Sequence, residues 1–515
     1  MTRKKLPIGI QSFEEIRTDG YYYVDKTPYA LRLVDEGKYY FLSRPRRFGK
    51  SLFLSTLAEM FGGNRELFEG LYCYDRWDWD VVYPVVRLSF SARTLSAEWL
   101  DQRIGELLAD NERRLGLPTG SGTAAGRLTT LIRHAEEKHG QKVVVLVDEY
   151  DKPMLDTLSD PDLARAVRDR LASLYGPLKE ESVHLKFVLL TGVSKFSKVN
   201  IFSGLNNLND ITLDEGYSAI CGYTEGDVDT VFASELDGLD RDEVRQWYNG
   251  YNWTGEAVYN PFDLLLLFQK RKFRPYWFET GTPTFLVETL MRQSYYLPRL
   301  QQVDATESLL SAFDVGSVSP EALLFQTGYL TIGATREVTQ GLRYLLRFPN
   351  REVRASLTEA LLSACSPDPG QVVARTGRLP DLLEAADFAG IEELFTSHFA
   401  SIPHDWYRKN EIAQAEGYYA SVFYAFFASL GLDTIPEDTS SFGRLDMAVR
   451  LPEAVWLFEL KMVDDEPEGS ALRQIKDRGY ADKYRADGLP VHLVGVEFSR
   501  ARRNVVAFDA ETISA

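Results

Sequence analysis

The chain has 515 residues and a mass of 58.5 kDa, and its 58 Lys and Arg against 75 Asp and Glu give a formal net charge of −17 and a pI near 5.0. Hydrophobic residues make up 44% and aromatic residues 12%, which excludes a largely disordered chain and predicts about three domains. So acidic a surface repels a phosphate backbone, and contact with nucleic acid therefore requires a local positive patch.

The cysteines and the start of the chain indicate a cytoplasmic location. Cys73, Cys221 and Cys365 lie far apart and form no CxxC pair, so neither a disulfide framework nor a thiolate zinc site is expected. The N-terminal residues contain no apolar segment typical of a secretory signal, and no stretch approaches the roughly 20 apolar residues of a membrane helix. We therefore expect a cytoplasmic protein that has no membrane partner.

From about residue 38 to 215, short apolar segments alternate with helical patterns, which is typical of a parallel sheet with crossover helices. The predicted strands are 38–43, 83–90, 142–148 and 183–191. The predicted helices between them are 50–61, 95–114, 124–139 and 160–175. Because the strands are continuously apolar, we expect them to be buried on both faces of the sheet.

The sequence SRPRRFGKSLFLSTL (43–57) predicts a loop that binds phosphate. A strand, a loop ending in Gly49-Lys50-Ser51 and a helix place backbone N–H groups around an anion. Lys50 would add a positive charge, and the Ser51 hydroxyl would be a ligand for Mg²⁺.

The general phosphate-loop pattern is incomplete, because Arg44 stands where it has its first glycine. Arg46 and Arg47 add positive charge where the phosphates would lie. The alternative is a chance Gly-Lys-Ser between a strand and a helix, a combination that is common.

Two acids follow the apolar segment of VVVLVDEYDKP (143–153). Asp148 and Glu149 would lie at the carboxyl edge of the sheet, where open α/β sheets bind ligands. There Asp148 would bind Mg²⁺ and Glu149 would orient the water that attacks the nucleotide, although both acids could instead cap the next helix. Thr191 and Ser194 follow the next strand and would contact the γ-phosphate, or serve as ordinary turn residues.

The middle of the chain reads differently. Residues 216–312 are mostly helical and rich in aromatic residues. A helix over 320–328 precedes strands at 329–334 and 342–348 joined by a polar turn, which fits either the end of a winged-helix module or a generic helical subdomain with a hairpin. Residues 366–380 carry Pro, Gly and Ser and are the expected linker, followed by a helical stretch over 381–400.

A second compact α/β unit is expected from about residue 405 to 510, and its two strands carry acids. An amphipathic helix over 411–431 precedes strands 443–451 and 454–463, which a four-residue turn with proline in second position joins. That turn sets Asp446 directly opposite Glu459 in an antiparallel pair. Facing carboxylates repel each other, whereas a divalent cation between them would turn the repulsion into binding.

Lys461 shares the sheet face of Glu459, because side chains two residues apart point to the same side. Two acids and a lysine on one face form the D-(x)n-E-x-K arrangement of a metal-dependent phosphodiesterase, in which Lys461 would stabilise developing charge. Glu416 on the preceding helix is a further candidate metal ligand. Gln474 and Tyr480, expected on the next helix, resemble the Gln-to-Tyr element of RecB-like nucleases.

Basic residues are frequent around these strands and are candidate phosphate contacts, although interleaved acids favour a mixed solvated surface to the same extent. They are Arg473, Lys476, Arg478, Lys483, Arg485, Arg500, Arg502 and Arg503.

Several sequence blocks in order resemble the prokaryotic AAA-ATPase-like family, whose members usually carry a C-terminal PD-(D/E)XK nuclease-like domain. The blocks are SRPRRFGKS, VLVDEYDKP, LTGVSKFSKVNIFSGLNNLNDIT, WYNGYNW, VYNPF, YWFETGTPTFL and FQTGYLTI, and they cover most of residues 5–350. Arginine at the position of Arg44 is usual in that family. The C-terminal part resembles the PD-(D/E)XK superfamily in the order of its elements, which is a helix, a strand with Asp, a strand with ExK and a second helix.

The sequence therefore predicts an α/β protein with a P-loop ATPase core (1–215), a helical and winged-helix-like region (216–365), a linker and helical connector (366–404) and a PD-(D/E)XK nuclease-like domain (405–515). We expect ATP and Mg²⁺, with Mn²⁺ as a substitute, as cofactors, DNA as the partner through a local basic patch, and oligomers as an open possibility. The expected function is ATP hydrolysis coupled to metal-dependent DNA cleavage in defence or DNA processing. The alternative is a nucleotide-dependent switch whose C-terminal domain binds nucleic acid or protein without cutting.

Overall fold

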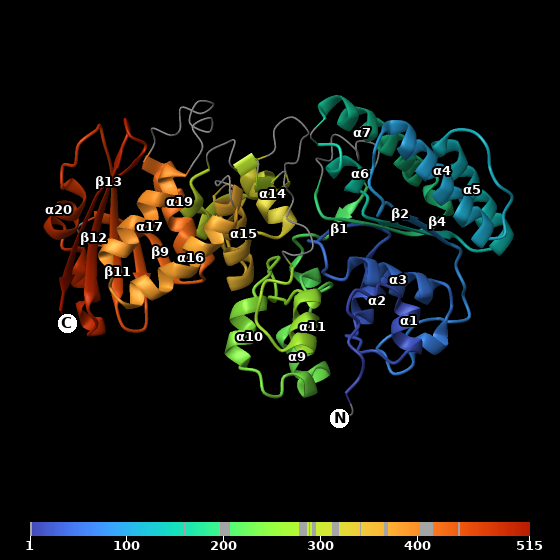
Figure 1. The fold of residues 1–515 in the computed structure, drawn as a ribbon. Coiled ribbons are helices and arrows are strands. Elements are labelled where there is room, and N and C mark those ends of the chain that lie inside the picture. The colour runs from blue at the N-terminus through green and yellow to red at the C-terminus, as the bar shows by residue number, and fades with distance from the viewer. Residues whose placement is uncertain are drawn as a thin grey trace. The chain divides into compact units, whose positions relative to one another are not determined.

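The structure is a computed structural model that describes residues 3–158, 160–195, 207–277, 286–287, 289–290, 295–311, 319–339, 341–364, 369–401, 416–440 and 443–514 (Figure 1). The chain forms two compact units, one of Met1–Gly281 with Val303–Asn350 and one of Thr282–Gln302 with Arg351–Ala515. The four segments expected from the sequence are thus grouped into two units, and the chain passes between the units more than once.

The first unit is built on a parallel five-stranded sheet in the order β2-β3-β4-β1-β5. The strands are β1 (Tyr39–Ser43), β2 (Val85–Ser89), β3 (Val143–Asp148), β4 (Leu185–Gly192) and β5 (Asn209–Asp210). All five apolar residues that begin β3 are buried, as expected for a strand covered on both faces. The parallel α/β fold predicted from the sequence is confirmed.

Helices cover both faces of this sheet, with α4, α5 and α7 on one side and α1, α2 and α3 on the other (Figure 1). Their bounds are α1 (Phe13–Thr18), α2 (Thr27–Glu36), α3 (Lys50–Phe61), α4 (Ala97–Arg114), α5 (Ala124–His139), α6 (Lys152–Leu155), α7 (Pro161–Tyr175) and α8 (Pro177–Glu180). Short 3-10 helices occupy Arg65–Phe68, Ser182–His184, Glu215–Tyr217 and Ala233–Glu235. The four predicted crossover helices agree with α3, α4, α5 and α7 to within two residues.

Two further subdomains complete the first unit. Helices α9 (Glu225–Val231), α10 (Arg241–Tyr248) and α11 (Pro261–Lys270) share an aromatic core with Tyr22 and Val24 from the N-terminal segment. Strands β6 (Val303–Thr306), β7 (Thr331–Val338) and β8 (Gly341–Arg347) form an antiparallel sheet in the order β6-β8-β7, with α13 (Glu307–Ser311) and α14 (Pro320–Thr327) between β6 and β7.

The predicted helix and hairpin at residues 320–348 are confirmed, but the expected polar turn is wrong in extent. β7 continues through Val338 because residues 335–338 pair with β8, and all four are exposed, so polar side chains are compatible with a strand there. A polar stretch therefore indicated an exposed strand and not a turn.

The second unit contains a mixed five-stranded sheet in the order β13-β12-β11-β10-β9, in which only the β11–β12 pair is parallel among the described strands. The strands are β9 (Asp433–Ser440), β10 (Gly443–Arg450), β11 (Val455–Val463), β12 (Val491–Ser499) and β13 (Asn504–Ile513). The helices are α15 (Arg351–Ala364), α16 (Pro369–Glu384), α17 (Phe388–Ala400), α19 (Glu416–Ser429) and α20 (Ser470–Asp477), with 3-10 helices at Leu297–Gln301 and Tyr480–Asp487.

The two faces of this sheet carry different helices. Phe423 and Phe427 of α19 pack against Phe458 of β11. Helix α20 instead packs against β11 and β12 from the face that carries Glu459, where Ile475 joins Leu457 and Leu493 in a second core. The site described below therefore lies on the α20 face.

The linker expected at residues 366–380 is wrong, because α16 begins at Pro369 and continues through Gly377 and Pro380 to Glu384. Val372, Leu379 and Leu383 are buried, which places one apolar stripe of α16 against α17. Proline and glycine had suggested a linker, but the burial of this stripe outweighs their low helix propensity.

Some expectations fall on residues outside the described part of the chain. They include Cys365, the block ETGTP (279–283) and the first residues of the helix predicted at 411–431. Cys73 and Cys221 are buried and free. Within the described ranges, no helix combines the length and the apolar character that crossing a membrane would require.

Candidate functional site

The loop between β1 and α3 has the geometry of a phosphate cradle. Gly49 precedes α3 with φ of +94°, a backbone conformation that residues with a side chain rarely adopt. The first N–H groups of α3 have no acceptor within the helix and point out of its N-terminus, together with the positive end of the helix dipole. An anion placed at this end would therefore meet both N–H donors and a favourable field.

A chain of hydrogen bonds connects the loop to the two neighbouring strands. The Ser51 hydroxyl donates to Asp148 Oδ2 at 2.5 Å, and the Thr191 hydroxyl donates to Asp148 Oδ1 at 2.8 Å. Because β4 lies between β1 and β3 in the sheet, Thr191 stands beside Asp148 at the carboxyl edge. The structure thus brings Ser51, Asp148 and Thr191 together as the sequence predicts.

Lys50 is buried and bonds to the loop itself. Its Nζ donates to the carbonyl oxygens of Arg44 and Pro45, both at 2.9 Å. Burial lowers the pKa of Lys50, while Asp148 acts in the opposite direction. The ammonium group is therefore held inside the curve of the loop, within reach of an anion that would replace one carbonyl.

Glu149 follows Asp148 with a positive φ of 51°, which is uncommon for a residue with a long side chain. Burial raises the pKa of its carboxyl, and the neighbouring Asp148 raises it further. Such a raised pKa is typical of carboxyl groups that accept a proton during catalysis.

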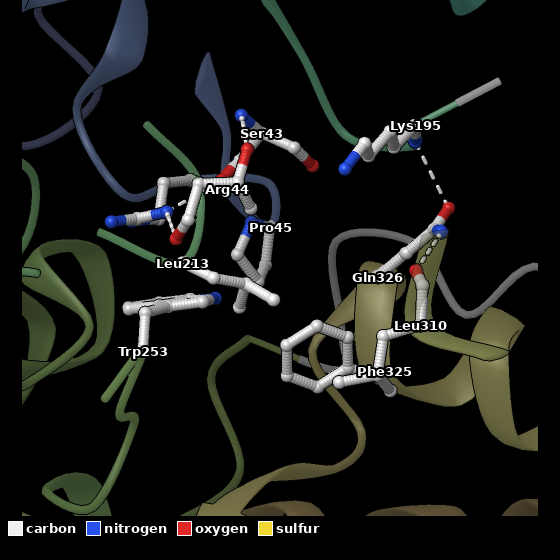
Figure 2. Close-up of a pocket in the computed structure, with 10 residues that line it drawn as sticks. Ser43, Arg44, Pro45, Lys195, Leu213, Trp253, Leu310, Phe325 and Gln326 are labelled. Atoms are coloured by element: carbon white, nitrogen blue, oxygen red, sulfur yellow. Dashed lines mark hydrogen bonds between the residues drawn. The ribbon is translucent and has the colours of Figure 1, made fainter. Parts of the chain in front are cut away.

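Arg44 has a structural position that sequence reasoning missed. Its guanidinium is fully buried and donates to the carbonyl oxygens of Ser43, Thr212, Tyr217 and Ser218. It lies 4.1 Å from the ring centroid of Trp253, and Figure 2 shows these two side chains beside each other. Burial lowers its pKa to about 10. The residue in place of the first glycine therefore ties the phosphate loop to the segment after β5.

Arg46 and Arg47, in contrast, are exposed on the loop, as the prediction of phosphate contacts requires. The Arg47 guanidinium lies over the ring of Phe262, 4.7 Å from its centroid, and the Arg46 carbonyl accepts a hydrogen bond from Trp277 at 3.3 Å. The loop is thus held by aromatic residues of the helical subdomain.

Asp151 is a second missed residue, three positions after Asp148. It is buried, and its Oδ2 accepts hydrogen bonds from the backbone N–H groups of Val193 and Ser194 and from the Ser194 hydroxyl. Burial raises its pKa, although the Ser194 hydrogen bonds lower it. Ser194, which we expected near the γ-phosphate, therefore fixes the segment after β4.

The residues at this edge fit a magnesium nucleotide. A hydroxyl and a carboxylate form the hard oxygen donor set that Mg²⁺ prefers when phosphate oxygens and water complete its shell. Ser51 and Asp148 supply that pair, and Lys50 with the start of α3 supplies the anion site.

In the second unit, the predicted register between β10 and β11 is confirmed. Met447 pairs with Phe458 and Arg450 with Val455, and the turn is closed by a hydrogen bond from Leu451 N–H to the Ala454 carbonyl at 2.9 Å. The ladder ends at the pair Met447 and Phe458, and continuing its register by one residue places Asp446 opposite Glu459. Asp446 Oδ2 also accepts a hydrogen bond from the backbone N–H of Leu460 at 2.7 Å, which holds its carboxylate against β11.

Glu459 is the most unusual carboxyl of this unit. It is 1% exposed, and its pKa rises to about 7, first because of burial and next because of Asp446. Lys461 Nζ lies 3.1 Å from Glu459 Oε1, and Gln474 Nε2 donates to the same oxygen. Within the described residues, Glu459 Oε2 is buried and has no hydrogen-bond partner.

Gln474 lies on α20 as expected and reaches Glu459 from there, whereas Tyr480 does not lie on α20. The expectation that Tyr480 shares the helix of Gln474 is wrong, because Gly479, at φ of +58°, separates α20 from the next 3-10 helix. The Tyr480 hydroxyl donates instead to the Arg444 carbonyl at 2.9 Å. Glu416 is the first residue of α19, and its side chain lies outside the described part of the structure.

Glu497 and Gly495 of β12, which the sequence did not single out, bind α20 to the sheet. Buried Glu497 accepts hydrogen bonds from the Ser470 hydroxyl and from four consecutive backbone N–H groups, those of Glu468, Gly469, Ser470 and Ala471. Gly495 lies beside Glu459 in the parallel ladder, and a β-carbon there would overlap the backbone nitrogen of Leu472. Both residues therefore set the position from which Gln474 reaches Glu459.

The expected basic patch is largely neutralised. Five of its eight residues form ion pairs with acids, namely Lys476, Lys483, Arg485, Arg500 and Arg502. Most of their partners are acids that alternate with them along the sequence. The structure therefore favours the alternative of a mixed, solvated surface.

The pair Asp446 and Glu459 fits a divalent cation, because a buried carboxylate oxygen that lacks a partner would gain one. Among the described residues, no cluster of three or more His, Cys, Asp or Glu is placed for metal binding.

Comparisons with known proteins match the two parts of the chain in which these residues lie. Residues 7–202 match a family model described as predicted AAA-ATPase, and residues 414–508 match one described as PD-(D/E)XK nuclease superfamily. The chain is 61% identical to a protein of Azotobacter chroococcum mcd 1, described as "Uncharacterized protein in vnfD 5'region", over 515 residues and the full length of both chains. The chain belongs to the same family as that protein, and it combines an AAA-ATPase-like domain with a domain of the PD-(D/E)XK nuclease superfamily.

Proposed function

We propose that this protein binds and hydrolyses ATP at the β1–α3 loop and cleaves DNA by metal-dependent hydrolysis at the β10–β11 hairpin. The observation that carries the proposal is the pair of facing carboxylates with Lys461 at 3.1 Å from Glu459 and a buried, unpartnered Glu459 oxygen among the described residues. A sheet that served only structure would gain from replacing one of these acids.

At the nucleotide site, Lys50 and the first N–H groups of α3 would bind the β- and γ-phosphates. Ser51 and Asp148 would hold Mg²⁺, which when bound neutralises charge on the phosphates. Glu149 would orient the attacking water and accept its proton, a role that its raised pKa suits. Thr191 of β4 donates to Asp148, and it would change its contacts when the γ-phosphate is released.

At the hairpin site, a cation bound by Asp446 and Glu459 would supply an activated water and neutralise charge on the scissile phosphate. Lys461 would move from Glu459 toward the phosphate and stabilise the developing negative charge. Gln474, bonded to Glu459 Oε1, would orient that carboxylate so that Oε2 faces the cation.

The nuclease half is tested with purified full-length protein, plasmid DNA, ATP and either Mg²⁺ or Mn²⁺. We expect nicked or linear DNA from the wild type, and at least a hundredfold loss of the cleavage rate in Asp446→Asn and Glu459→Gln. Asp433→Asn, at the exposed start of β9 in the same sheet, is the matched control and should cleave normally. Equal cleavage by wild type and Asp446→Asn would reject the nuclease and leave the nucleotide-dependent switch.

The ATPase half is tested by nucleotide binding and phosphate release. Lys50→Ala should lose both, whereas Glu149→Gln should bind ATP and lose turnover, because only the second residue acts after binding. Lys142→Ala, exposed at the opposite end of β3, is the control. A nucleotide site kept only for structure predicts that neither variant changes binding or release.

A further inference from the structure

The antiparallel sheet β6-β8-β7 has two unlike faces. One face is packed in the core of its subdomain and consists of Val303, Ala305, Ile332, Tyr344 and Leu346. Because side chains alternate along a strand, the other residues of β8 and their partners point away from that core. This second face carries three arginines, Arg336, Arg343 and Arg347, which we call the arginine face.

Two members of the arginine face lie directly opposite each other. Arg336 of β7 pairs with Arg343 of β8 in the ladder, and Thr306 of β6 lies on the other side of Arg343. Like charges at directly opposed positions of an antiparallel pair destabilise the sheet. As with Asp446 and Glu459, a repulsive pair in a hairpin indicates a ligand of opposite charge.

Arg347 extends the face along β8, four residues or about 13 Å from Arg343. Arg347 pairs with Thr331 in the ladder, and its side chain passes over Gly333, where β7 has an irregular register. A β-carbon added at Gly333 would come within 2.8 Å of Arg347 Cδ. Glycine at this position therefore makes room for the arginine side chain on the exposed face.

Within the described part of the chain, none of the three guanidinium groups forms an ion pair or a hydrogen bond, although Asp304 lies on the same face on β6. Glu337 points to the opposite face, and Glu307 lies at the end of β6. By contrast, Arg500 and Arg502 beside the hairpin site are paired with acids. In a protein with a net charge of −17, arginines that have no acidic partner indicate a binding site for an anionic ligand.

We propose that the arginine face binds the phosphate backbone of double-stranded DNA, an inference that rests on the proposed nuclease function because it names where the substrate is held. Arginine is suited to this role, since its planar fork matches a phosphate with two donors. Contacts to phosphates alone carry no sequence information, so the face holds DNA of any sequence. It also supplies the local positive patch that the acidic chain requires.

The test measures binding of full-length protein to a fluorescent duplex of about 30 base pairs, in EDTA so that no cleavage occurs, between about 50 and 200 mM salt. We expect Arg336→Ala/Arg343→Ala/Arg347→Ala to bind at least tenfold more weakly and to lower the slope of log affinity against log salt by about two to three. The matched control Arg103→Ala/Arg113→Ala/Arg165→Ala removes the same charge from arginines that are paired with acids on α4 and α7. It should change the slope little.

Each outcome decides one point. If the triple variant and its control bind DNA equally with equal salt slopes while the wild type still cleaves plasmid, the inference is wrong and the proposed function stands. If the wild type neither binds nor cuts the duplex, the proposed function fails as well. Weaker binding with an unchanged salt slope would mean that the three arginines affect DNA binding only through protein stability, and it would contradict direct phosphate contacts. Retained ATP binding by the triple variant shows that it is folded.

Discussion

Arg44 in the first unit and Glu497 in the second are fully buried charges, and both form hydrogen bonds with several backbone groups. Arg44 donates to four carbonyl oxygens beneath the phosphate loop, whereas Glu497 accepts from four N–H groups at the start of α20. Each one holds a candidate site in place without being part of its chemistry. They differ, however, in how well the fold compensates the charge.

Burial lowers the pKa of Arg44 to about 10, so the fold disfavours its charged form. Burial raises the pKa of Glu497, but the hydrogen bonds from Glu468, Gly469 and Ser470 outweigh it and the pKa falls below the ordinary 4.5. The first N–H groups of a helix have no other acceptor and carry the positive end of the dipole, whereas Arg44 Nε is left without a partner among the described residues. A helix start therefore compensates a buried charge better than scattered carbonyls do.

The largest effect expected from this comparison is the loss of Glu497. Glu497→Ala leaves four N–H groups without an acceptor and should reduce the free energy of unfolding of the second unit by about 3–5 kcal/mol. Hydrogen exchange of the amides at 468–471 and thermal unfolding measure it. Glu511→Ala, on the neighbouring strand with a half-exposed side chain, should cost less than about 1 kcal/mol. Equal losses of stability in Glu497→Ala and Glu511→Ala would show that Glu497 has no special role in holding α20.

Removing Arg44 should have a smaller effect, because its charge is already disfavoured. Arg44→Ala should cost about 2–4 kcal/mol through the cavity and the unsatisfied carbonyls, and ATP binding should weaken with it. Arg44→Lys should not restore stability, because an ammonium group cannot reach the Ser43, Thr212 and Tyr217 carbonyls together. Denaturant unfolding checks this, with exposed Arg113→Ala as a control within about 0.5 kcal/mol of the wild type.

The acids of the two sites should respond to substitution with opposite signs. Asp148→Ala deprives the Ser51 and Thr191 hydroxyls of their acceptor and should destabilise the first unit by about 1–3 kcal/mol. Glu459→Gln removes a repelled carboxylate and should stabilise the metal-free second unit by about 1–3 kcal/mol at pH 8.

The sign of the Glu459 effect follows from its pKa, which rises from 4.5 unfolded to about 7 folded. Its contribution to stability is therefore complete below pH 4.5 and is lost as the pH rises through about 7. The gain in Glu459→Gln should accordingly disappear when unfolding is measured near pH 4 in EDTA. A gain that is the same at both values would mean that Glu459 is not repelled by its surroundings.

Glu497 should give the smallest and opposite pH effect. Its folded pKa lies below 4.5, so its contribution is present above pH 4.5 and is lost as the pH falls through the folded pKa. The difference in unfolding free energy between wild type and Glu497→Gln should therefore shrink between pH 6 and pH 3. Urea unfolding at the two pH values measures it, and a constant difference would contradict the lowered pKa.

Sequence patterns predicted the parts of both sites that depend on local order. The order of strand, loop and helix around Gly49 predicted the phosphate loop. The apolar segment ending in Asp148 predicted an acid beside that loop, because parallel strands end at a common edge of the sheet. The position of the turn at 451–454 was sufficient to predict that Asp446 faces Glu459, because the turn sets the register of an antiparallel pair.

What the sequence did not reveal depends on contacts between distant segments. Arg44 bonds to carbonyls about 170 residues away, and Glu497 is nearly 30 residues from the N–H groups that it accepts from, so no local pattern marks either one. Nor could composition show that Arg500 and Arg502 are paired with acids more than 30 residues earlier. The helix at Pro369–Glu384 was missed for a similar reason, since the burial of Val372 and Leu379 depends on α17.

Gly495 has a consequence for how descendants of this chain would lose activity. A single codon change to alanine would push Leu472 and its helix away from the strand, and Gln474 would leave Glu459. Every acid and the lysine of the motif would remain in the sequence of such a variant. Inactive members could therefore arise in one step without losing any residue that a motif search examines.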